Sequence, residues 1–206
     1  MHCDKTALHH LILILDEVFG IQNFKNEIIW HYKRWSSTKT ALQSNHQTIL
    51  FYSKSKLNKF NTLYTEYSPT TNIDQILQER KRNEHGSVVY KKNDDGTIVM
   101  AKEKKGVPLG DVWEMPYLNP KASGRVGYPT QKPILLLEQI IKIGTDENDI
   151  VFEPFCGSGT SLVVSKLLNR KYIGVDIFEE VCLLANMRLK NPIKTKSFLL
   201  EKGVTY

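Results

Sequence analysis

The sequence predicts an α/β fold with a mostly parallel sheet, and a strand–helix–strand pattern towards the C-terminus carries that prediction. The runs DIVFEPF (residues 149–155) and KYIGVD (171–176) are largely apolar, as in strands that are covered on both faces. Residues 158–169 between them have the pattern of a helix. A strand, a helix and a second strand at this spacing imply parallel pairing through a right-handed crossover.

The bulk composition is that of a folded protein with one domain, or one domain carrying an insertion. The chain has 206 residues, of which 41% are apolar and 24% are charged. Its three cysteines, Cys3, Cys156 and Cys182, show no CxxC spacing, which argues against a disulfide framework and against a metal site. No apolar run approaches the ~20 residues of a membrane span, and the N-terminus does not resemble a signal peptide. We therefore expect a cytoplasmic protein that does not contact a membrane.

The first 53 residues predict one helix and two strands. Leu8, Leu11, Ile12 and Leu15 recur at helical spacing across residues 6–19, and Gly20 is expected to end that helix. The segments NEIIWHY (26–32) and TILFY (48–52) are rich in β-branched and aromatic residues, which is typical of strands. The polar and basic stretch 33–45 between them predicts a loop.

From residue 54 the composition becomes polar and charge-rich, which indicates an inserted module. We expect a helix at residues 73–82 and a hairpin in which 87–91 and 97–101 flank a turn at Asp95-Gly96. Residues 107–128 are rich in glycine and proline and are expected to be mostly irregular, with Trp113 and Tyr117 as anchors. Regular structure resumes with a helix that Pro133 opens and that extends through residue 143, and 179–190 predicts a last helix.

The turn FCGSGT (residues 155–160) is the candidate ligand site. Gly157 and Gly159 let the backbone turn sharply and let a ligand approach closely, at the carboxyl end of a strand. Asp176 ends the next strand, about 20 residues downstream, where a carboxylate suits hydrogen bonds to ribose hydroxyls. An isolated GxG would indicate no more than a tight turn, but this context predicts a nucleoside pocket.

Other readings of the turn fit the residues less well. A dinucleotide site needs a third glycine where this chain has Leu162, and a P-loop needs a lysine directly after the glycines. Cys156 lies inside the turn without a histidine nearby in the sequence to activate it. We therefore interpret Cys156 as a small residue lining the pocket rather than as a nucleophile.

Taken together, these motifs resemble the bacterial site-specific DNA amino-methyltransferases of the adenine-N6 and cytosine-N4 class. FEPFCGSGT is similar to the family's cofactor motif, which usually has Asp where this chain has Glu153, and YIGVD matches the motif that follows it. YPTQKP (128–133) resembles the segment that precedes the glycine motif in the permuted subgroup, where the cofactor motif is C-terminal. The resemblance implies an incomplete, Rossmann-type S-adenosylmethionine (SAM) methyltransferase fold. It also implies SAM-binding roles for Thr130, Lys132, Glu153, Pro154, Phe155, Cys156, Gly157, Ser158, Gly159, Thr160 and Asp176.

The resemblance also divides the chain and implies DNA as the partner. Residues 1–53 correspond to part of the catalytic half, 54–127 to a target-recognition module and 128–206 to the SAM-binding half. The net charge of +6 permits a nucleic-acid partner without requiring one. Basic and aromatic residues in the first loop and in the module are candidates for contact with double-stranded DNA, although a solvated surface explains such residues as well. These candidates are Lys33, Arg34, Trp35, Lys39, Lys91 and Lys92.

One family motif does not occur in the chain. The catalytic tetrapeptide (D/N/S)PP(Y/F/W) is absent from the sequence, and Met115-Pro116-Tyr117 and Asn119-Pro120 come nearest to it. No catalytic residue is therefore assigned. We expect a C-terminal part of a longer or split enzyme, with marginal stability or a partner chain that supplies the missing strands.

Three functions follow as expectations. The first is SAM-dependent methylation of adenine, or less readily cytosine, at a specific DNA site within a restriction–modification system, where a restriction subunit is a second possible partner. The second is a chain that binds SAM and DNA without catalysis of its own. Methylation of RNA or protein is the third, and the extended match to DNA enzymes weakens it.

Overall fold

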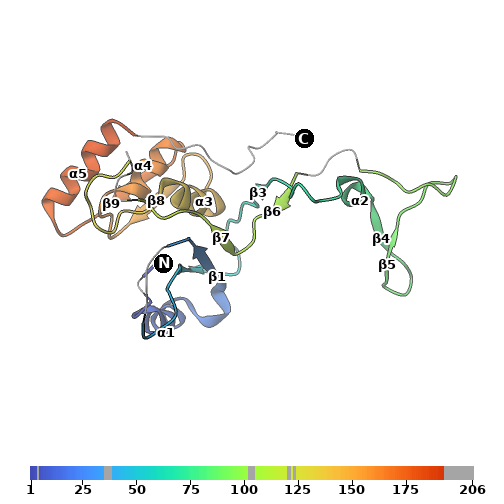
Figure 1. Cartoon of the computed structure of the whole chain (residues 1–206), viewed down its shortest axis with the longest axis horizontal. Helices are drawn as coiled ribbons and strands as arrows, with labels where there is room; N and C mark the ends of the chain where they lie inside the picture. The colour runs from blue at the N-terminus through green and yellow to red at the C-terminus, as the bar shows by residue number, and fades with distance from the viewer. Residues whose placement is uncertain (4, 35–38, 102–104, 120–121, 123, 193–206) are drawn as a thin grey trace. The chain divides into compact units, whose positions relative to one another are not determined.

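The computed structural model describes residues 1–3, 5–34, 39–101, 105–119, 122 and 124–192, which form two compact units. The described residues of the first unit lie within Met1–Asn61 and Gly110–Ser197, and those of the second within Thr62–Leu109. The first unit holds two small sheets with the long helices, and the second holds short strands and one short helix (Figure 1). The chain is thus mixed α/β, as the sequence predicts.

The N-terminal sheet of the first unit has the strand order β2–β1–β7. Helix α1 (Leu8–Phe19) ends at Gly20, whose φ of 84° lies in the region that favours glycine. After the turn η1 (Ile21–Asn23), β1 (Phe24–His31) pairs antiparallel with β2 (His46–Tyr52). Helix α1 and both strands were predicted within two residues at each end, because their apolar and aromatic patterns are strong.

Strand β7 (Val112–Glu114) was not predicted and pairs parallel with β1. It lies in the segment expected to be irregular, because three residues between glycine and proline are too few to show an alternating pattern. Trp113 of β7 is nevertheless buried, as expected of an anchor, and the indole N–H of Trp30 donates to the carbonyl of Met115 at 3.0 Å. These contacts fix the start of the segment that leads to residues 128–133.

The C-terminal sheet pairs β8 (Ile150–Glu153) with β9 (Lys171–Gly174) in parallel, as predicted. Helices α3 (Ile134–Gly144), α4 (Thr160–Leu167) and α5 (Glu179–Lys190) gather around these two strands (Figure 1). Helix α4 connects the strands and is buried over most of its length, and its neighbours are α3, α5, β8 and β9. The crossover thus supplies the core of this part of the unit.

The prediction that both strands are covered on both faces was wrong. Ile150 and Phe152 of β8 are 62% and 61% exposed, and every residue of β9 is exposed. In the described part of the chain the sheet consists of β8 and β9 alone, and α4 covers one face. The apolar composition of β8 and β9 therefore predicts a cover on both faces, and the described residues do not supply all of it.

The second unit was predicted less accurately. Strand β3 (Tyr64–Thr65) pairs with β6 (Val107–Pro108), and helix α2 (Ile73–Leu77) follows the side-chain cap of Asn72. The predicted helix at 73–82 was wrong in its second half, because Arg80–Arg82 form strand β4, which pairs antiparallel with β5 (Val88–Tyr90). The predicted turn at Asp95-Gly96 is present, and Lys92 and Ile98 on either side of it form an isolated antiparallel bridge. The strand that pairs with β5, however, is β4.

Candidate functional site

The glycine turn lies at the carboxyl ends of the two parallel strands. Backbone bonds tie it to both of them: the N–H of Cys156 donates to the carbonyl of Val175, and the N–H of Val175 donates to the carbonyl of Glu153, each at 2.9 Å. The N–H of Gly159 then donates to the carbonyl of Cys156 at 2.8 Å and closes the turn. A ligand site at the carboxyl edge of parallel strands is the usual arrangement in open α/β sheets.

Both glycines of the turn are required by its geometry. Gly157 and Gly159 have φ values of 49° and 71°, which residues with a side chain rarely adopt. A Cβ on Gly159 would lie 2.6 Å from the Cβ of Ala185 on α5, closer than atoms can pack. A Cβ on Gly157 would lie 3.1 Å from the ring of Tyr128. Only glycine therefore allows α5 and the residue-128 segment to approach the turn this closely.

Asp176 holds the turn from the end of β9. Its Oδ2 accepts the Gly157 N–H at 2.9 Å, and its Oδ1 accepts the Phe178 N–H at 3.3 Å. The carboxylate predicted to contact a ribose therefore lies directly beside the glycine turn. The spacing of the two motifs in the sequence predicted that Asp176 and the glycine turn lie close together.

Arg188 contacts the same turn from α5, and no sequence motif indicated this residue. Its Nη1 donates to the carbonyl of Ser158 at 2.6 Å, to the hydroxyl of Ser158 at 3.2 Å and to the hydroxyl of Thr160 at 3.0 Å. Burial lowers the pKa of this guanidinium from its usual value. A cation that is partly removed from water and bonded three times to one turn fixes the shape of that turn.

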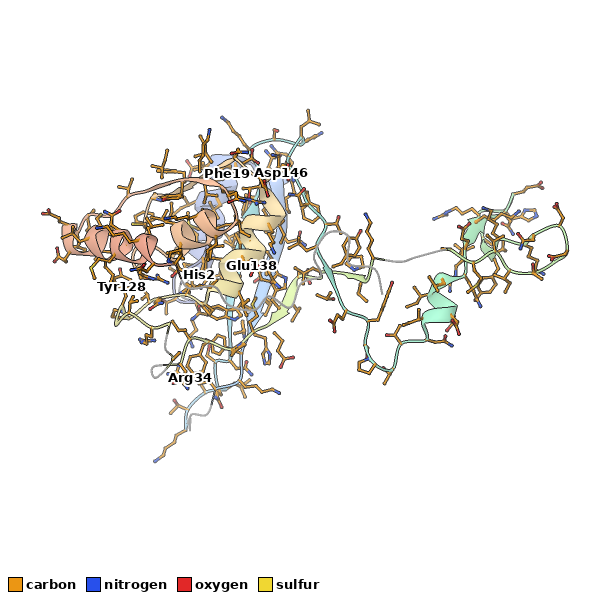
Figure 2. All side chains as sticks on the ribbon, turned by 90° about the horizontal axis from the view of Figure 1, so that it is seen from above. His2, Phe19, Arg34, Tyr128, Glu138 and Asp146 are labelled. Atoms are coloured by element: carbon orange, nitrogen blue, oxygen red, sulfur yellow. The ribbon has the colours of Figure 1, made fainter. Side chains whose placement is uncertain are left out.

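The segment 128–133 approaches the turn through Tyr128, which is labelled in Figure 2. Gln131 is buried and fixes the segment, because its Oε1 accepts the Val126 N–H at 2.9 Å and its Nε2 donates to the carbonyl of Gly124 at 2.8 Å. Burial lowers the pKa of the Lys132 ammonium. Thr130 is exposed, and its carbonyl accepts from Lys132 Nζ at 3.3 Å.

The structure brings predicted residues of two kinds together around a cavity of about 240 Å³. Arg34, predicted to contact DNA, lines this cavity together with Thr130 and Lys132, which the resemblance assigns to the cofactor. The aromatic side chains of Trp30, Tyr32 and Tyr117 contribute to the same walls. Cationic and aromatic groups therefore lie together beside the segment that approaches the glycine turn.

The first residues of the cofactor motif lie at a different cavity from Thr130 and Lys132. Glu153, Pro154 and Phe155 line a second cavity of about 380 Å³, whose other walls come largely from apolar residues of α1, β1, β2 and α3. Phe155 is 78% exposed. Cys156 is buried against Leu162 and Ala185, and burial raises the pKa of its thiol, which makes it a poor nucleophile.

The remaining predicted DNA contacts are spread over both units. Lys33 lies 3.7 Å from Glu114, and both side chains are largely exposed, so this pair contributes little stability. Lys39 is exposed, and Trp35 lies outside the described residues. In the second unit Lys91 pairs with Glu79 at 3.0 Å, whereas Lys92 is exposed next to it.

The carboxylates nearest the turn bond to backbone rather than to one another. Glu153 Oε1 accepts the Phe155 N–H at 3.3 Å, as Asp176 accepts that of Gly157. Within the ranges that the structure describes, no three His, Cys, Asp or Glu residues gather as metal ligands would. None of the helices in those ranges is long and apolar enough to cross a bilayer.

Comparison with known proteins identifies the family. The family model of the N6_N4_Mtase DNA methylases matches residues 1–187, and the chain belongs to this family. The chain is 30% identical over 182 residues to the type II methyltransferase M.HpaI of Haemophilus parainfluenzae. This match covers 88% of the present chain and 50% of M.HpaI. It is 32% identical over 179 residues to M1.MboII of Moraxella bovis, with 81% of this chain and 62% of that protein covered.

The chain spans about half the length of the curated relatives that it matches. Among solved structures it is similar to an M1.HpyAVI–SAM complex, with a TM-score of 0.55, 21% identity and coverage of 91% of this chain and 72% of that one. It is also similar to the cytosine-N4-specific PvuII DNA methyltransferase, with a TM-score of 0.57, 15% identity and coverage of 92% and 59%. These likenesses confirm the predicted methyltransferase fold.

Proposed function

We propose that this chain is part of a SAM-dependent enzyme that methylates an exocyclic amine of a DNA base at a specific sequence within a restriction–modification system. The observation that carries the proposal is the glycine turn held between Asp176 and Arg188 at the carboxyl edge of β8 and β9. Membership in the DNA methylase family supports it. The proposal includes adenine as the preferred base, cytosine as the alternative, and action in the cytoplasm.

The turn fits the nucleoside part of SAM. Gly157 and Gly159 give the turn the positive φ values that its tight bend at the strand ends requires, and Asp176 offers carboxylate oxygens beside it. SAM would supply the methyl group as an electrophilic sulfonium. We assign the remaining cofactor contacts to Thr130, Lys132, Glu153, Pro154, Phe155, Cys156, Ser158 and Thr160, through the family motifs that they match. Of these, the Lys132 ammonium suits the carboxylate of the methionine end.

The residues of this chain would orient the cofactor rather than transfer the proton. Holding the methyl donor in line with the amine is a large part of such catalysis. The target base is unreachable while it is stacked and paired, so it must leave the helix. Arg34 and Trp35, with Lys33 and Lys39 on the same loop, are proposed contacts for the DNA around that base, and Lys91 and Lys92 for the flanking duplex.

A second candidate function is a chain that binds SAM and DNA without catalysis on its own. The absent tetrapeptide favours it, as does the cavity of about 380 Å³, whose lining includes the exposed side chains of Phe152 and Phe155. We propose that a further polypeptide segment supplies the missing strands and the catalytic motif. That segment belongs either to the full-length enzyme or to a separate subunit, and a restriction subunit is a further candidate partner.

Calorimetric titration of the chain with SAM tests the proposed site. We expect binding in the wild type and a loss of about tenfold or more in Asp176→Ala, because charge-assisted hydrogen bonds contribute about 1.5–3 kcal/mol. Asp94→Ala, in an exposed turn of the second unit, is the matched control and should bind normally. A folded wild-type chain that does not bind SAM contradicts the proposal.

Activity separates the two candidates. A tritiated-methyl assay on genomic DNA, with and without the polypeptide encoded directly upstream, reports methyl transfer, and digestion to nucleosides distinguishes N6-methyladenine from N4-methylcytosine. Transfer by the chain alone contradicts the non-catalytic candidate. Transfer only with the upstream polypeptide supports it.

A further inference from the structure

The hairpin of β4 and β5 in the second unit has two faces of different charge. Residues directly opposite one another in an antiparallel pair lie on the same face, and successive residues alternate between faces. The register pairs Arg80 with Tyr90, Lys81 with Val89 and Arg82 with Val88. Arg80 and Arg82 therefore share one face, and Lys81 lies on the other.

The face with the two arginines carries positive charge, and neither arginine forms an ion pair within the described part of the chain. The guanidinium of Arg80 lies over the ring of Tyr90, 5.4 Å from its centroid. Alternation places Lys92, two residues beyond Tyr90, on this face as well. Arg80, Arg82 and Lys92 are all exposed, and so are Val88 and Tyr90, at 61% and 39%.

The opposite face is nearly neutral. Its basic residues are Lys81 and Lys91, and Lys91 Nζ lies 3.0 Å from Glu79 Oε2, which cancels one of the two charges. The neighbouring turn, at residues 93–97, carries Asp94 and Asp95. Hydrogen bonds from Thr97 lower the pKa of Asp95, so the tip of this turn carries negative charge.

We propose that the hairpin docks on duplex DNA through the face that carries Arg80, Arg82 and Lys92, with Lys81 and Lys91 turned away. A two-stranded ribbon has dimensions that the major groove admits. The unit as a whole does not select a face, because residues 62–109 hold eight Lys and Arg against seven Asp and Glu. The selection comes from the pairing register. The inference rests on the proposed function and narrows its DNA contacts, retaining Lys92 and removing Lys91.

Fluorescence anisotropy of the full chain with a 5′-labelled duplex of mixed sequence, over 50–200 mM NaCl, tests this assignment. Two double variants remove the same charge from opposite faces: Arg80→Gln with Arg82→Gln, and Lys81→Gln with Lys91→Gln. Each phosphate contact contributes about 0.9 to the slope of log affinity against log salt. We expect the arginine variant to reduce the magnitude of that slope by about 1.8. The wild type should then lose about twelvefold more affinity than this variant between 50 and 200 mM NaCl. The lysine variant should keep the wild-type slope.

The adjacent lysines give a second, independent comparison. Lys92→Gln should lower the slope by about 0.9, and Lys91→Gln should leave it unchanged. Equal effects of the two double variants, or no effect of the arginine pair, would overturn the assignment while leaving the proposed function intact. A wild-type chain with no salt-dependent affinity for DNA would instead overturn the DNA part of the proposed function, and this inference with it.

Discussion

Arg188 joins helix α5 to the candidate site through a single nitrogen. Its Nη1 reaches the carbonyl and hydroxyl of Ser158 and the hydroxyl of Thr160, and it is partly buried. Because the proposed cofactor lies against this turn, the shape of the turn determines which backbone groups face it. We therefore treat Arg188 as a positioning residue for the proposed site.

Replacing Arg188 with Met should weaken SAM binding about tenfold, because a charged hydrogen bond to a partly buried carbonyl contributes about 1.5–3 kcal/mol. Arg188→Lys should recover part of the affinity, since a lysine ammonium can donate to some of these Ser158 and Thr160 oxygens but not to all of them. Calorimetric titration measures both. Arg170→Met is the matched control: Arg170 also bonds to backbone and hydroxyl oxygens, of Thr145 and Leu168, but away from the turn. Equal SAM affinity in Arg188→Met and wild type would remove the positioning role.

Lys132 predicts a pH dependence of cofactor affinity. Burial lowers the pKa of its ammonium, so the charged form is disfavoured in the free chain. A carboxylate bound beside it favours the charged form, and binding then takes up a proton. Affinity for SAM should therefore fall as the pH rises through the lowered pKa of Lys132 in the free chain. The Lys132→Met variant should lack the part of the pH dependence that comes from Lys132. Titration of the amino group of SAM itself should affect the affinity of the wild type and of the variant alike. Parallel pH profiles for the two proteins would exclude Lys132 from the site.

The sequence predicted the near contacts of this site and missed the distant one. Gly157, Gly159 and Asp176 follow from a turn and a strand end, which local spacing reveals. Arg188 lies 30 residues beyond Ser158, near the end of a helix, where a basic residue is expected simply to complement the helix dipole. Its role depends on how α5 packs on the turn, which no local pattern encodes.

At the scale of elements, the packing of α5 on the glycine turn depends on Gly159. Its φ of 71° and the 2.6 Å between a Cβ built there and that of Ala185 leave no room for a side chain. Gly159→Ala should lower the free energy of unfolding by about 2–4 kcal/mol, through backbone strain and overpacking together. Urea unfolding followed by circular dichroism measures the change.

Gly144→Ala is the matched control for that substitution. Gly144 ends α3, has no positive φ, and a Cβ built on it meets nothing within 4 Å. The change should be neutral or stabilise the chain by up to about 1 kcal/mol, since alanine favours helix. Similar destabilisation by both substitutions would show that the contact with Ala185 is not the cause.

Elements with a strong local pattern were predicted, and short strands that depend on their pairing partner were not. The bounds of α3 fall within one residue of the prediction at both ends, whereas Arg80–Arg82 were predicted as helix and form a strand. Arginine and lysine favour helices in isolation, so local preference gave the wrong answer there. Their strand forms because Val88–Tyr90 lie opposite them across a turn in which the Asn83 side chain accepts backbone N–H groups from His85 and Ser87.

At the scale of the molecule, the exposed apolar surface of β8 and β9 is the main departure from an ordinary domain. Phe152 and Ile173 are more than half exposed, as is Ile150. Composition predicts strands covered on both faces, but whether covering elements are present cannot be read from the strand itself. The proposed extra segment would supply that cover.

This surface predicts that the isolated chain binds hydrophobic dye and self-associates. We expect fluorescence enhancement of anilinonaphthalene sulfonate at neutral pH, reduced in Phe152→Ser, because large exposed apolar patches attract such ligands. Val112→Ser, at an exposed position of β7 elsewhere in the same unit, is the control and should leave the signal nearly unchanged. Limited proteolysis and light scattering complete the measurement: a protease-resistant, dye-silent monomer would contradict the exposure.

The double anchoring of the glycine turn has a consequence for the thermodynamics of ligand entry. Asp176 holds Gly157 from one side and Arg188 holds Ser158 from the other, before any ligand arrives. Little conformational entropy is then lost when a ligand settles on the turn, because the backbone is already ordered. Amide hydrogen exchange across residues 156–160 should therefore be slow in the free chain and change little on addition of SAM.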